Sequence, residues 1–398
     1  MSSIERRIRQ GEKRWCAKYR DPSGKQRVKV FTRKLDAERY LTTIEASKLT
    51  GSYVDPSLGH LTIDSWSQRW LSGQVHLKAS TRARYEGIIR EHVGPRWGRT
   101  RLADVKHSEV QAWVTNLSSA RSTATVRKIH RVFSLILALA VADGGLVRNP
   151  ATGISLPRVA TAEKRFLTHQ QVDELARYAG DPYDRSSRAS GREKSAAASY
   201  RLVVLFLAYT GVRFGEMAAL PVGRLDLERR RASIVEAVTV VGGVQTWGTP
   251  KGHERRDVPI PRFIADELAD HVAGRSSEEL VFPAPEGGAL RAQGFQRAAL
   301  NQAASRVGRH GLHPHELRHT AASLAIASGA DVKVVQQMLG HRSATMTLDL
   351  YGHLFADRLD DVAERLHADR SAALVYPVCT GPASRPLSNG SGEGRQPV

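Results

Sequence analysis

Six apolar residues between positions 125 and 145 follow the i, i+3, i+4, i+7, i+8, i+11 spacing that places side chains on one face of a buried α-helix. They are Ile129, Val132, Phe133, Ile136, Leu137 and Ala140. Gly144 and Gly145 follow, and glycine commonly ends a helix. The basic residues Arg127, Lys128 and Arg131 lie outside this apolar face. The pattern predicts a small helical domain with a basic exterior, and we place it at residues 60–150.

Two further boundaries follow from composition. The segment NPATGISLPRVATAEKR has two prolines and little apolar periodicity, so we expect an interdomain linker at residues 151–165. The chain of 398 residues is long enough for two or three domains. We expect a larger domain at 166–375 and a disordered tail, rich in Gly, Ser and Pro, at 376–398.

The larger domain mixes helical and extended patterns. SYRLVVLFLAYTG reads as a buried helix, whereas ASIVEAVTV, GGV and RRDVPI read as a hairpin or small antiparallel sheet. Helical patterns resume from Phe295. The expected fold class is mainly α with small antiparallel β-sheets, that is α+β.

The first 58 residues form a separate basic block, with 14 Lys and Arg against 7 Asp and Glu. RWCAKYR and QRVKVF, joined by the turn-forming DPSGK, predict a β-hairpin with basic faces. LDAERYLTTIEASKL predicts a helix that packs on the hairpin through Leu41, Ile44 and Leu49. A module of this size is too small for a catalytic domain, but its strands can lie in a DNA groove.

The net charge of the chain is +19 and its pI is about 10.3. Such an excess favours a polyanionic partner, nucleic acid first, over a basic surface that only maintains solubility. Cys16 and Cys379 lie at opposite ends of the chain and predict no disulfide framework, which indicates a reducing cytoplasm. The start MSSIERRIRQGEKRW lacks the apolar core of a signal peptide, and we expect a cytoplasmic protein with no membrane partner.

The stretch HPHELRH, residues 313–319, is compatible with two chemistries. As His-Glu-x-x-His it offers His315 and His319 as zinc ligands and Glu316 as a general base. As His-x-x-Arg it offers His315 and Arg318 on one face near a helix N-terminus that begins with Pro314, where an anion is favoured. Either interpretation needs support from residues elsewhere.

That support comes from three other motifs of the larger domain. TGVRFGEM contains Arg213 and Glu216, and PKGHERRDVPIP contains Lys251 in a turn between strands. MLGHRSATMTLDLYGHL adds His341 and Tyr351. The zinc interpretation leaves Arg213, Lys251 and Tyr351 unexplained, because none of these side chains serves a protease of that type.

The whole series resembles the tyrosine recombinases, the phage integrase family. TGVRFGEM, HPHELRHT, LGHRS and LDLYGHL match the family's boxes in order between Leu167 and Asp361. Residues 60–150 resemble the core-binding domain of that family, and the basic block at 1–58 is similar to an arm-binding domain. The layout looks most like integrases of actinobacteriophages and related mobile elements. The polar insertion GDPYDRSSRASGREKSAAAS departs from the family pattern before the helix that precedes Arg213.

The resemblance implies a role for each matched residue. Arg213 and Arg318 would grip the non-bridging oxygens of a phosphodiester, and planar guanidinium groups suit such bidentate contacts. Tyr351 would attack phosphorus and form a 3′-phosphotyrosyl link. Lys251 would protonate the departing 5′-oxygen.

The remaining matched residues would support this chemistry. His315 would assist proton transfer at the nucleophile, His341 would hydrogen-bond the scissile phosphate, and Glu216 would orient the active site. His319 and Glu316 are interpreted as helix residues, with His319 packing near the site. The resemblance implies no cofactor and no metal.

Two other classes of DNA-acting protein would show part of this pattern. A transcription factor would show the same charge and helices but has no use for Tyr351, and a topoisomerase would use the same chemistry to cut and reseal one strand. The basic block at 1–58 favours an integrase, since bridging distant sites needs a second DNA-binding surface. The resemblance implies double-stranded DNA with core and arm sites as the partner, a homotetramer on two duplexes, and a host DNA-bending protein and an excision factor as accessory proteins.

Overall fold

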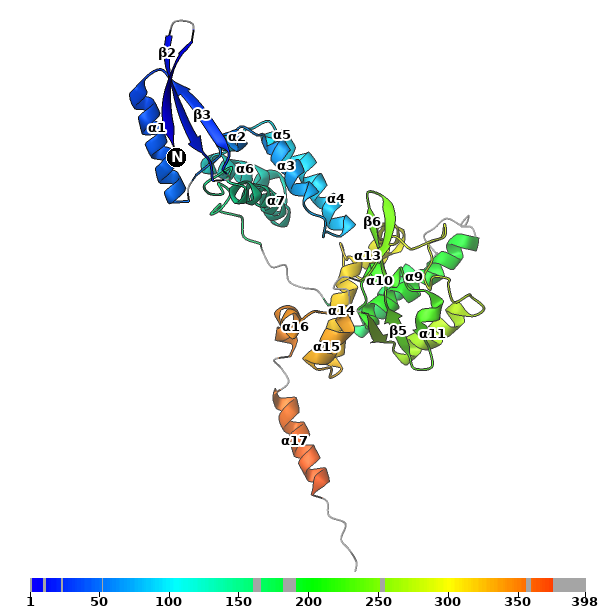
Figure 1. Cartoon of the computed structure of the whole chain (residues 1–398). Helices are drawn as coiled ribbons and strands as arrows, with labels where there is room; N and C mark the ends of the chain where they lie inside the picture. The colour runs from blue at the N-terminus through cyan, green and yellow to red at the C-terminus, as the bar shows by residue number, and fades with distance from the viewer. Residues whose placement is uncertain are drawn as a thin grey trace, which may run out of the picture. The chain divides into compact units, whose positions relative to one another are not determined.

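The computed structural model describes residues 2–9, 12–22, 24–51, 53–159, 166–181, 191–250, 255–355 and 359–374 (Figure 1). These residues form two compact units. The first comprises the described residues within Met1–Lys164 and Val238–Gly248, and the second comprises those within Arg165–Ala237 and Thr249–Val398. The expected tail at 376–398, the linker residues 160–165 and the insertion residues 182–190 lie outside the described parts. No described helix is long and apolar enough to cross a membrane.

The first unit begins with a three-stranded antiparallel sheet in the order β1-β2-β3. The strands are β1 (Ser3–Arg9), β2 (Glu12–Arg20) and β3 (Gln26–Phe31). The expected hairpin corresponds to β2 and β3. The additional strand β1 is a correction: most of its residues are charged, so hydrophobic alternation does not reveal it, yet Ile4 pairs with Ala17 in the sheet.

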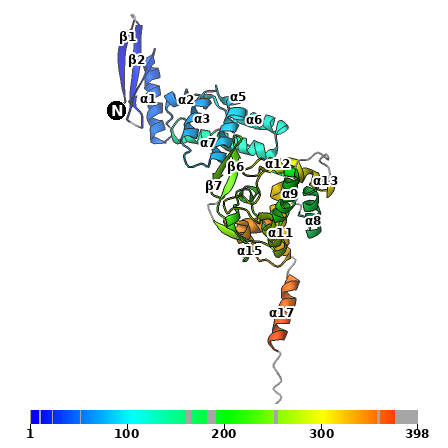
Figure 2. The same cartoon turned by 90° about the vertical axis from the view of Figure 1, so that its right-hand side faces the viewer.

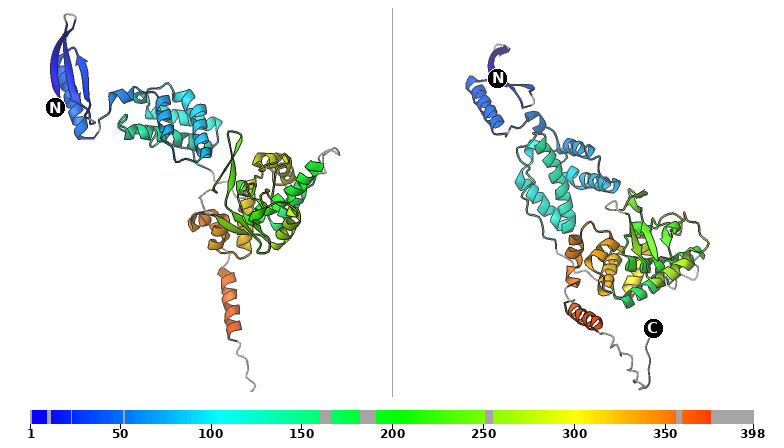
Figure 3. Two further views of the ribbon diagram at one scale, coloured as in Figure 1. Left: turned by 45° about the vertical axis from the view of Figure 1, so that its right-hand side comes forward. Right: turned by 60° about the horizontal axis from the view of Figure 1, so that its bottom comes forward.

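Helix α1 (Lys34–Leu49) packs on one face of this sheet, as the left view of Figure 3 shows. Leu41 and Ile44 are buried there, as expected, together with Ala37. The expected contact of Leu49 is wrong, because its side chain is 89% exposed. Leu49 lies five residues beyond Ile44, which turns it off a face that repeats every three or four residues.

The rest of the first unit is helical. Its helices are α2 (Pro56–Gly59), α3 (Ile63–Ser72), α4 (Ala79–Ile88), α5 (Gly94–Trp97), α6 (His107–Ala120) and α7 (Thr123–Ala142), with a π-helical turn at Ile89–Val93 and a 3₁₀ turn at Leu102–Asp104. All six apolar residues predicted on the α7 face are buried, which confirms the spacing argument. Phe133 of α7 stacks on Trp97 with ring centroids 5.3 Å apart.

The second unit is also mainly helical. Its helices are α8 (His169–Ala179), α9 (Gly191–Thr210), α10 (Phe214–Met217), α11 (Arg262–Val272), α12 (Ala292–Phe295), α13 (Asn301–Arg306), α14 (Pro314–Ala327), α15 (Val332–Leu339), α16 (Ala344–Tyr351) and α17 (Leu359–Ala373). Short 3₁₀ or π turns lie at Val222–Arg224, Gln296–Leu300 and Gly352–Leu354. Helix α9 packs against α14 and against α8 and α11, which are labelled near it in Figure 2. The apolar run Leu202–Leu207 within α9 is buried, as predicted.

Two small antiparallel sheets complete the structure. β4 (Leu225–Asp226), β5 (Arg231–Ile234) and β8 (Arg256–Pro259) form one in the order β4-β5-β8, and β6 (Ala237–Val241) pairs with β7 (Val244–Gly248) in the other. The run ASIVEAVTV is therefore divided between the two sheets. The fold is mainly α with small antiparallel sheets, which confirms the expected class.

Candidate active site

Glu216, at the start of the protein's α10, lies at the centre of an ion-pair cluster. Its side chain is 1% exposed. Nη1 of Arg213 donates to Oε1 of Glu216 over 2.8 Å, and the backbone N–H of Arg213 donates to Oε2 over 2.9 Å. Nη2 of Arg256, from β8, donates to Oε2 over 2.6 Å. Burial alone would raise the pKa of Glu216, but the hydrogen bond and charge of Arg256 and the charge of Arg213 lower it below its ordinary value. The carboxylate is therefore ionised at neutral pH.

Arg256 connects this carboxylate to the end of α15. Its Nε donates to the carbonyl oxygen of Met338 over 3.2 Å. Gly340 ends the helix with φ +61°, and a Cβ there would lie 3.0 Å from Cδ of Arg256. Because glycine adopts this backbone conformation without strain and leaves room for the arginine, the chain can turn directly into His341.

Arg318 is buried in α14 and holds two backbone segments together. Its Nη2 donates to the carbonyl of Leu339 over 2.5 Å, and its Nη1 donates to the carbonyl of Gly211. Gly211 has φ +66°, a backbone conformation that favours glycine, and a Cβ at this position would also lie 2.7 Å from Cδ2 of Leu339. Burial and then the charge of Arg213 lower the pKa of Arg318 to about 9. The guanidinium is still a cation at neutral pH.

These arginines leave the cluster with an excess of positive charge. The charges of Arg213 and Arg256 both disfavour the charged form of Arg318, and Glu216 offsets only part of this repulsion. A desolvated cationic group is stabilised by an anion that can accept its hydrogen bonds. The arrangement is therefore suited to hold an anionic oxygen group such as a phosphate.

His341 follows α15 and is 7% exposed. Its Nδ1 lies 3.0 Å from Oγ1 of Thr347 in α16. Burial, followed by the charges of Arg318 and Arg213, lowers the pKa of His341 to about 4. The ring is therefore neutral at pH 7, and when Nδ1 accepts from Thr347 its Nε2 carries a hydrogen that can be donated to an anion.

Tyr351 is the last residue of α16, and its side chain is 1% exposed. Its ring packs in an apolar cluster with Ala321, Ala322 and Leu339. The phenol oxygen lies 2.7 Å from Nδ1 of His319, in α14. Burial raises the pKa of Tyr351 to about 12, and the charge of Arg318 lowers it only in part. The phenol is therefore protonated at neutral pH.

His315 adjoins this pair. Its ring lies edge to face with that of His319, with centroids 5.0 Å apart. Glu316 caps the helix instead of facing the two histidines, since its Oε2 accepts the backbone N–H of His313 over 2.7 Å. Two members of the alternative zinc motif, Glu316 and His319, thus have other partners. Within the described ranges, no three His, Cys, Asp or Glu side chains are grouped as a metal ion would require.

The site residues predicted from sequence are largely brought together. One cluster within the second unit contains Arg213, Glu216, Arg318, His341 and Tyr351. His315 lies next to this cluster and contacts His319. Lys251 lies outside the described residues.

Two residues of the cluster were not singled out for a role in the site. Arg256 begins β8, in which Val258 is buried, and Ile260 directly after the strand is buried as well, so alternation along RRDVPI places the arginine on the same inward face. That signal is present in the sequence. His319 was interpreted as a packing residue, and only the position of α16 reveals its bond to Tyr351.

Comparisons with known families match two regions of the chain. Residues 165–358 match the model of the phage integrase family, and residues 62–118 match that of the phage integrase N-terminal SAM-like domain.

Similar proteins cover most of the chain. The putative prophage phiRv2 integrase of Mycobacterium tuberculosis is 28% identical over 376 residues, 90% of this chain and 94% of that protein. The tyrosine recombinase XerC of Roseiflexus castenholzii is 31% identical over 300 residues, 72% of this chain and 87% of that protein. Among solved structures, the Tn1549 transposon integrase in complex with a circular intermediate DNA has a TM-score of 0.64 and 20% identity, and covers 77% of this chain and 99% of that one.

Proposed function

Because the chain belongs to the phage integrase family of site-specific tyrosine recombinases, we propose that it cleaves and rejoins DNA through a 3′-phosphotyrosyl bond to Tyr351. The reaction would integrate or excise a phage genome or another mobile element. The observation that carries the proposal is the cationic cluster of Arg213, Arg256 and Arg318 beside a phenol oxygen. A phosphodiester that enters this cluster would supply the missing negative charge.

The proposed roles of the side chains follow from their chemistry. Arg213 and Arg318 bind the non-bridging oxygens, where negative charge accumulates in the transition state. Neutral His341 donates a hydrogen bond to the same phosphate. Glu216 fixes the guanidinium of Arg213 through the bonds described above, which leaves its other donors for the substrate.

Tyr351 attacks phosphorus, so that the Oη–P bond forms as the bond from phosphorus to the 5′-oxygen breaks. Lys251 protonates that oxygen, a role taken from its match to the family pattern. Attack on the phosphotyrosyl bond by the 5′-hydroxyl of a partner strand reverses these steps and completes strand exchange. The steps require neither a metal nor an organic cofactor.

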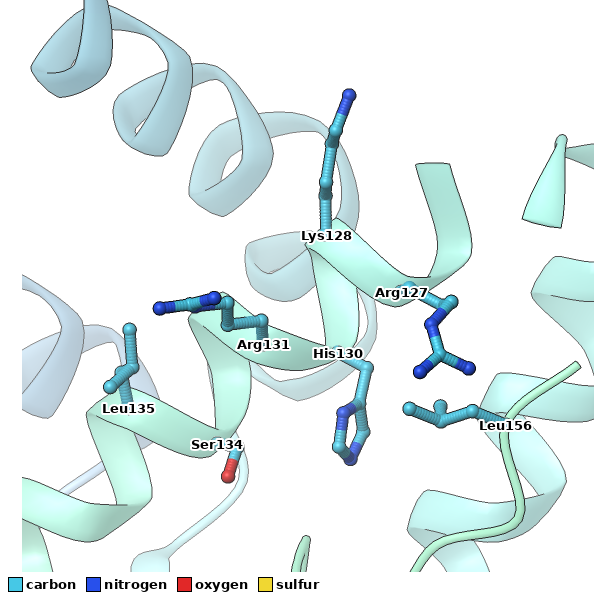
Figure 4. Close-up of a pocket in the computed structure, with 7 residues that line it drawn as sticks. All are labelled: Arg127, Lys128, His130, Arg131, Ser134, Leu135 and Leu156. Atoms are coloured by element: carbon cyan, nitrogen blue, oxygen red, sulfur yellow. The ribbon is translucent and has the colours of Figure 1, made fainter. Parts of the chain in front are cut away.

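DNA binding is proposed for the two N-terminal regions as well as for residues 166–375, the proposed catalytic domain. In the region 60–150, α7 presents Arg127, Lys128, His130 and Arg131 around a hollow of about 410 Å³. Figure 4 shows Arg127 beside Leu156, while Lys128 and Arg131 extend from the same helix in other directions. Arg127, Lys128 and Arg131 of this set would contact the phosphates of the core site.

The face of the N-terminal sheet that α1 leaves open would bind the arm site. Trp15, Ala17 and Tyr19 of β2 pack toward α1. Strand alternation therefore turns Arg14, Lys18 and Arg20 to the opposite face. Arg7 of β1 joins them as the register partner of Arg14. An open basic sheet face of this kind can enter a DNA groove.

A homotetramer on two duplexes is proposed from the family pattern. Helix α17 supports it, since Val362 is 51% exposed and Leu366 is 65% exposed, an apolar face that a second copy could cover. A host DNA-bending protein and an excision factor would complete the assembly.

A nicked suicide substrate that traps the covalent intermediate tests the proposed function. We expect the unmodified chain to yield a protease-sensitive adduct on a 3′-phosphate. Tyr351→Phe removes one oxygen and should yield none, with DNA affinity unchanged. An adduct formed by the Phe variant would disprove Tyr351 as the nucleophile.

A further inference from the structure

Thr347 in α16 is a buried threonine whose hydroxyl contacts the ring of His341. The residue is 0% exposed, and its Oγ1 lies 3.0 Å from Nδ1 of His341. Buried polar groups are normally hydrogen-bonded, and among the described residues Nδ1 is the partner of this hydroxyl. The contact therefore occupies one of the two ring nitrogens of His341.

The direction of this hydrogen bond follows from what each group can donate and accept. The ring of His341 is neutral at pH 7, so one of its nitrogens carries a hydrogen and the other a lone pair. If Nδ1 donated to Oγ1, the buried hydroxyl hydrogen of Thr347 would have no acceptor among the described residues, which costs free energy. If Thr347 donates to Nδ1, both groups are satisfied. The contact therefore favours the form of the ring that carries its hydrogen on Nε2.

The backbone of His341 is held as well, so the direction of the ring is fixed from two sides. The N–H of His341 donates to the carbonyl of Gln336, and the side-chain amide of Gln336 donates to the carbonyl of His341, each over 3.1 Å. The ring lies close enough to Arg318 and Arg213 for their charges to act on it. A hydrogen on Nε2 is thus offered next to the groups proposed to bind the phosphate, where a lone pair on Nε2 would repel a phosphate oxygen.

Thr347 also lies one helical turn before Tyr351. Residues four apart share a face of a helix, and both side chains are buried. Helix α16 therefore carries the nucleophile and, on the same face, the hydroxyl that directs His341.

We propose that Thr347 is a positioning residue of the recombination reaction, whose hydroxyl holds His341 in the form that donates Nε2–H to the scissile phosphate. The inference rests on the proposed function and deepens it. Thr347 acts through His341 and takes no part in the bond changes at phosphorus.

The first test observes the ring of His341 directly in the free protein at pH 7. Nitrogen NMR of histidine-labelled protein distinguishes a ring nitrogen that carries hydrogen from one that does not, and the signals of His341 are those lost in His341→Ala. In the unmodified chain, Nδ1 should lack hydrogen and Nε2 should carry it. Thr347→Val replaces the hydroxyl by a methyl group of similar shape and should give a mixture of the two ring forms.

The second test measures the single-turnover rate of adduct formation on the nicked substrate. Thr347→Val should be slower by about tenfold, since the net contribution of one neutral hydrogen bond corresponds to about that change in an equilibrium. DNA affinity should not change. Thr347→Ser keeps the hydroxyl and should restore both the rate and the ring form. Thr345→Val, at an exposed threonine of the same helix, is the matched control and should react like the unmodified chain.

A double variant separates action through His341 from simple support of α16. In a His341→Ala chain there is no ring to direct, so Thr347→Val should slow the reaction no further. The inference is overturned if the two losses multiply, if Thr347→Ser is as slow as Thr347→Val, or if Thr347→Val leaves the rate or the ring form unaltered. Absence of any adduct from the unmodified chain would instead overturn the proposed function, because the ring spectrum does not depend on catalysis.

Discussion

Arg256 and Glu216 form a buried ion pair, with Nη2 and Oε2 2.6 Å apart and 9% and 1% of the two side chains exposed. The carboxylate that orients Arg213 is thus held from a second direction, by a strand distant in sequence. The pair connects the turn after α9 to the end of α15, which are the two segments that carry Arg213 and His341.

Replacement of Arg256 by Met should destabilise the second unit by about 3–5 kcal/mol, because it leaves the Glu216 carboxylate buried without its main partner. Glu216 has a lowered pKa in the folded chain, so its stabilising contribution is present above its unfolded pKa and is lost as pH falls through the folded one. Urea denaturation at pH 7 measures the loss. The double variant with Glu216→Gln should recover part of it, and Arg262→Met, at an exposed side chain, should change stability little. An Arg256→Met variant as stable as the unmodified chain would contradict this account.

Arg213→Lys should slow adduct formation by about 10²-fold or more while DNA affinity falls far less. A lysine ammonium is a point charge and cannot bind Glu216 and a phosphate at once through a planar fork. Cleavage rates and binding isotherms on the same suicide substrate give the two quantities. Arg229→Lys, at an arginine that is 85% exposed, serves as the control. Equal losses of rate and affinity would show that Arg213 only anchors the DNA.

Substitution of both Arg7 and Arg14 by Gln should weaken binding to an arm-site duplex and leave cleavage of a core site intact. The two residues are cross-strand partners on the open sheet face, with 60% and 40% of their side chains exposed. If each contacts a phosphate, the slope of log affinity against log salt should become shallower by about 2. Arg39→Gln, on the exposed side of α1, should leave the slope unchanged. An unaltered slope in the double variant would reject this face as the binding surface.

His341 should make the free energy of unfolding depend on pH below neutrality. Its folded pKa of about 4 lies below the ordinary value of 6.5, so between these values the unfolded chain binds a proton that the folded chain does not. Stability contributed by the neutral ring is therefore complete above pH 6.5 and falls toward pH 4, by roughly 3 kcal/mol over the window. His341→Gln should show a flatter profile in urea denaturation at stepped pH, and His310→Gln should keep the original one. If the free energy of unfolding depends on pH in the same way in the His341→Gln variant and the unmodified chain, the lowered pKa of His341 is refuted.

Sequence patterns predicted the parts of this molecule that depend on local periodicity or on ordered motifs. The α7 face is an example, since one helix determines which of its residues share a side. The β1 strand was missed because pairing with β2, not its own apolar content, stabilises it. To predict that Arg256 belongs to the site, the alternation of β8 must be combined with the position of α15. To predict the contact of His319 with Tyr351, the position of α16 must be known. Both depend on contacts between segments far apart in sequence, which no spacing within one motif encodes.

The enclosure of Tyr351 has a consequence for fidelity. With 1% of the side chain exposed, Tyr351 is covered by its neighbours in this structure, so its surroundings must rearrange before a phosphodiester can reach the phenol oxygen. Breakage of a chromosome strand is irreversible if the partner end drifts away. Because Tyr351 must be exposed before it can react, recognition of the target precedes cleavage. An incorrect encounter therefore ends in dissociation with the DNA strand intact.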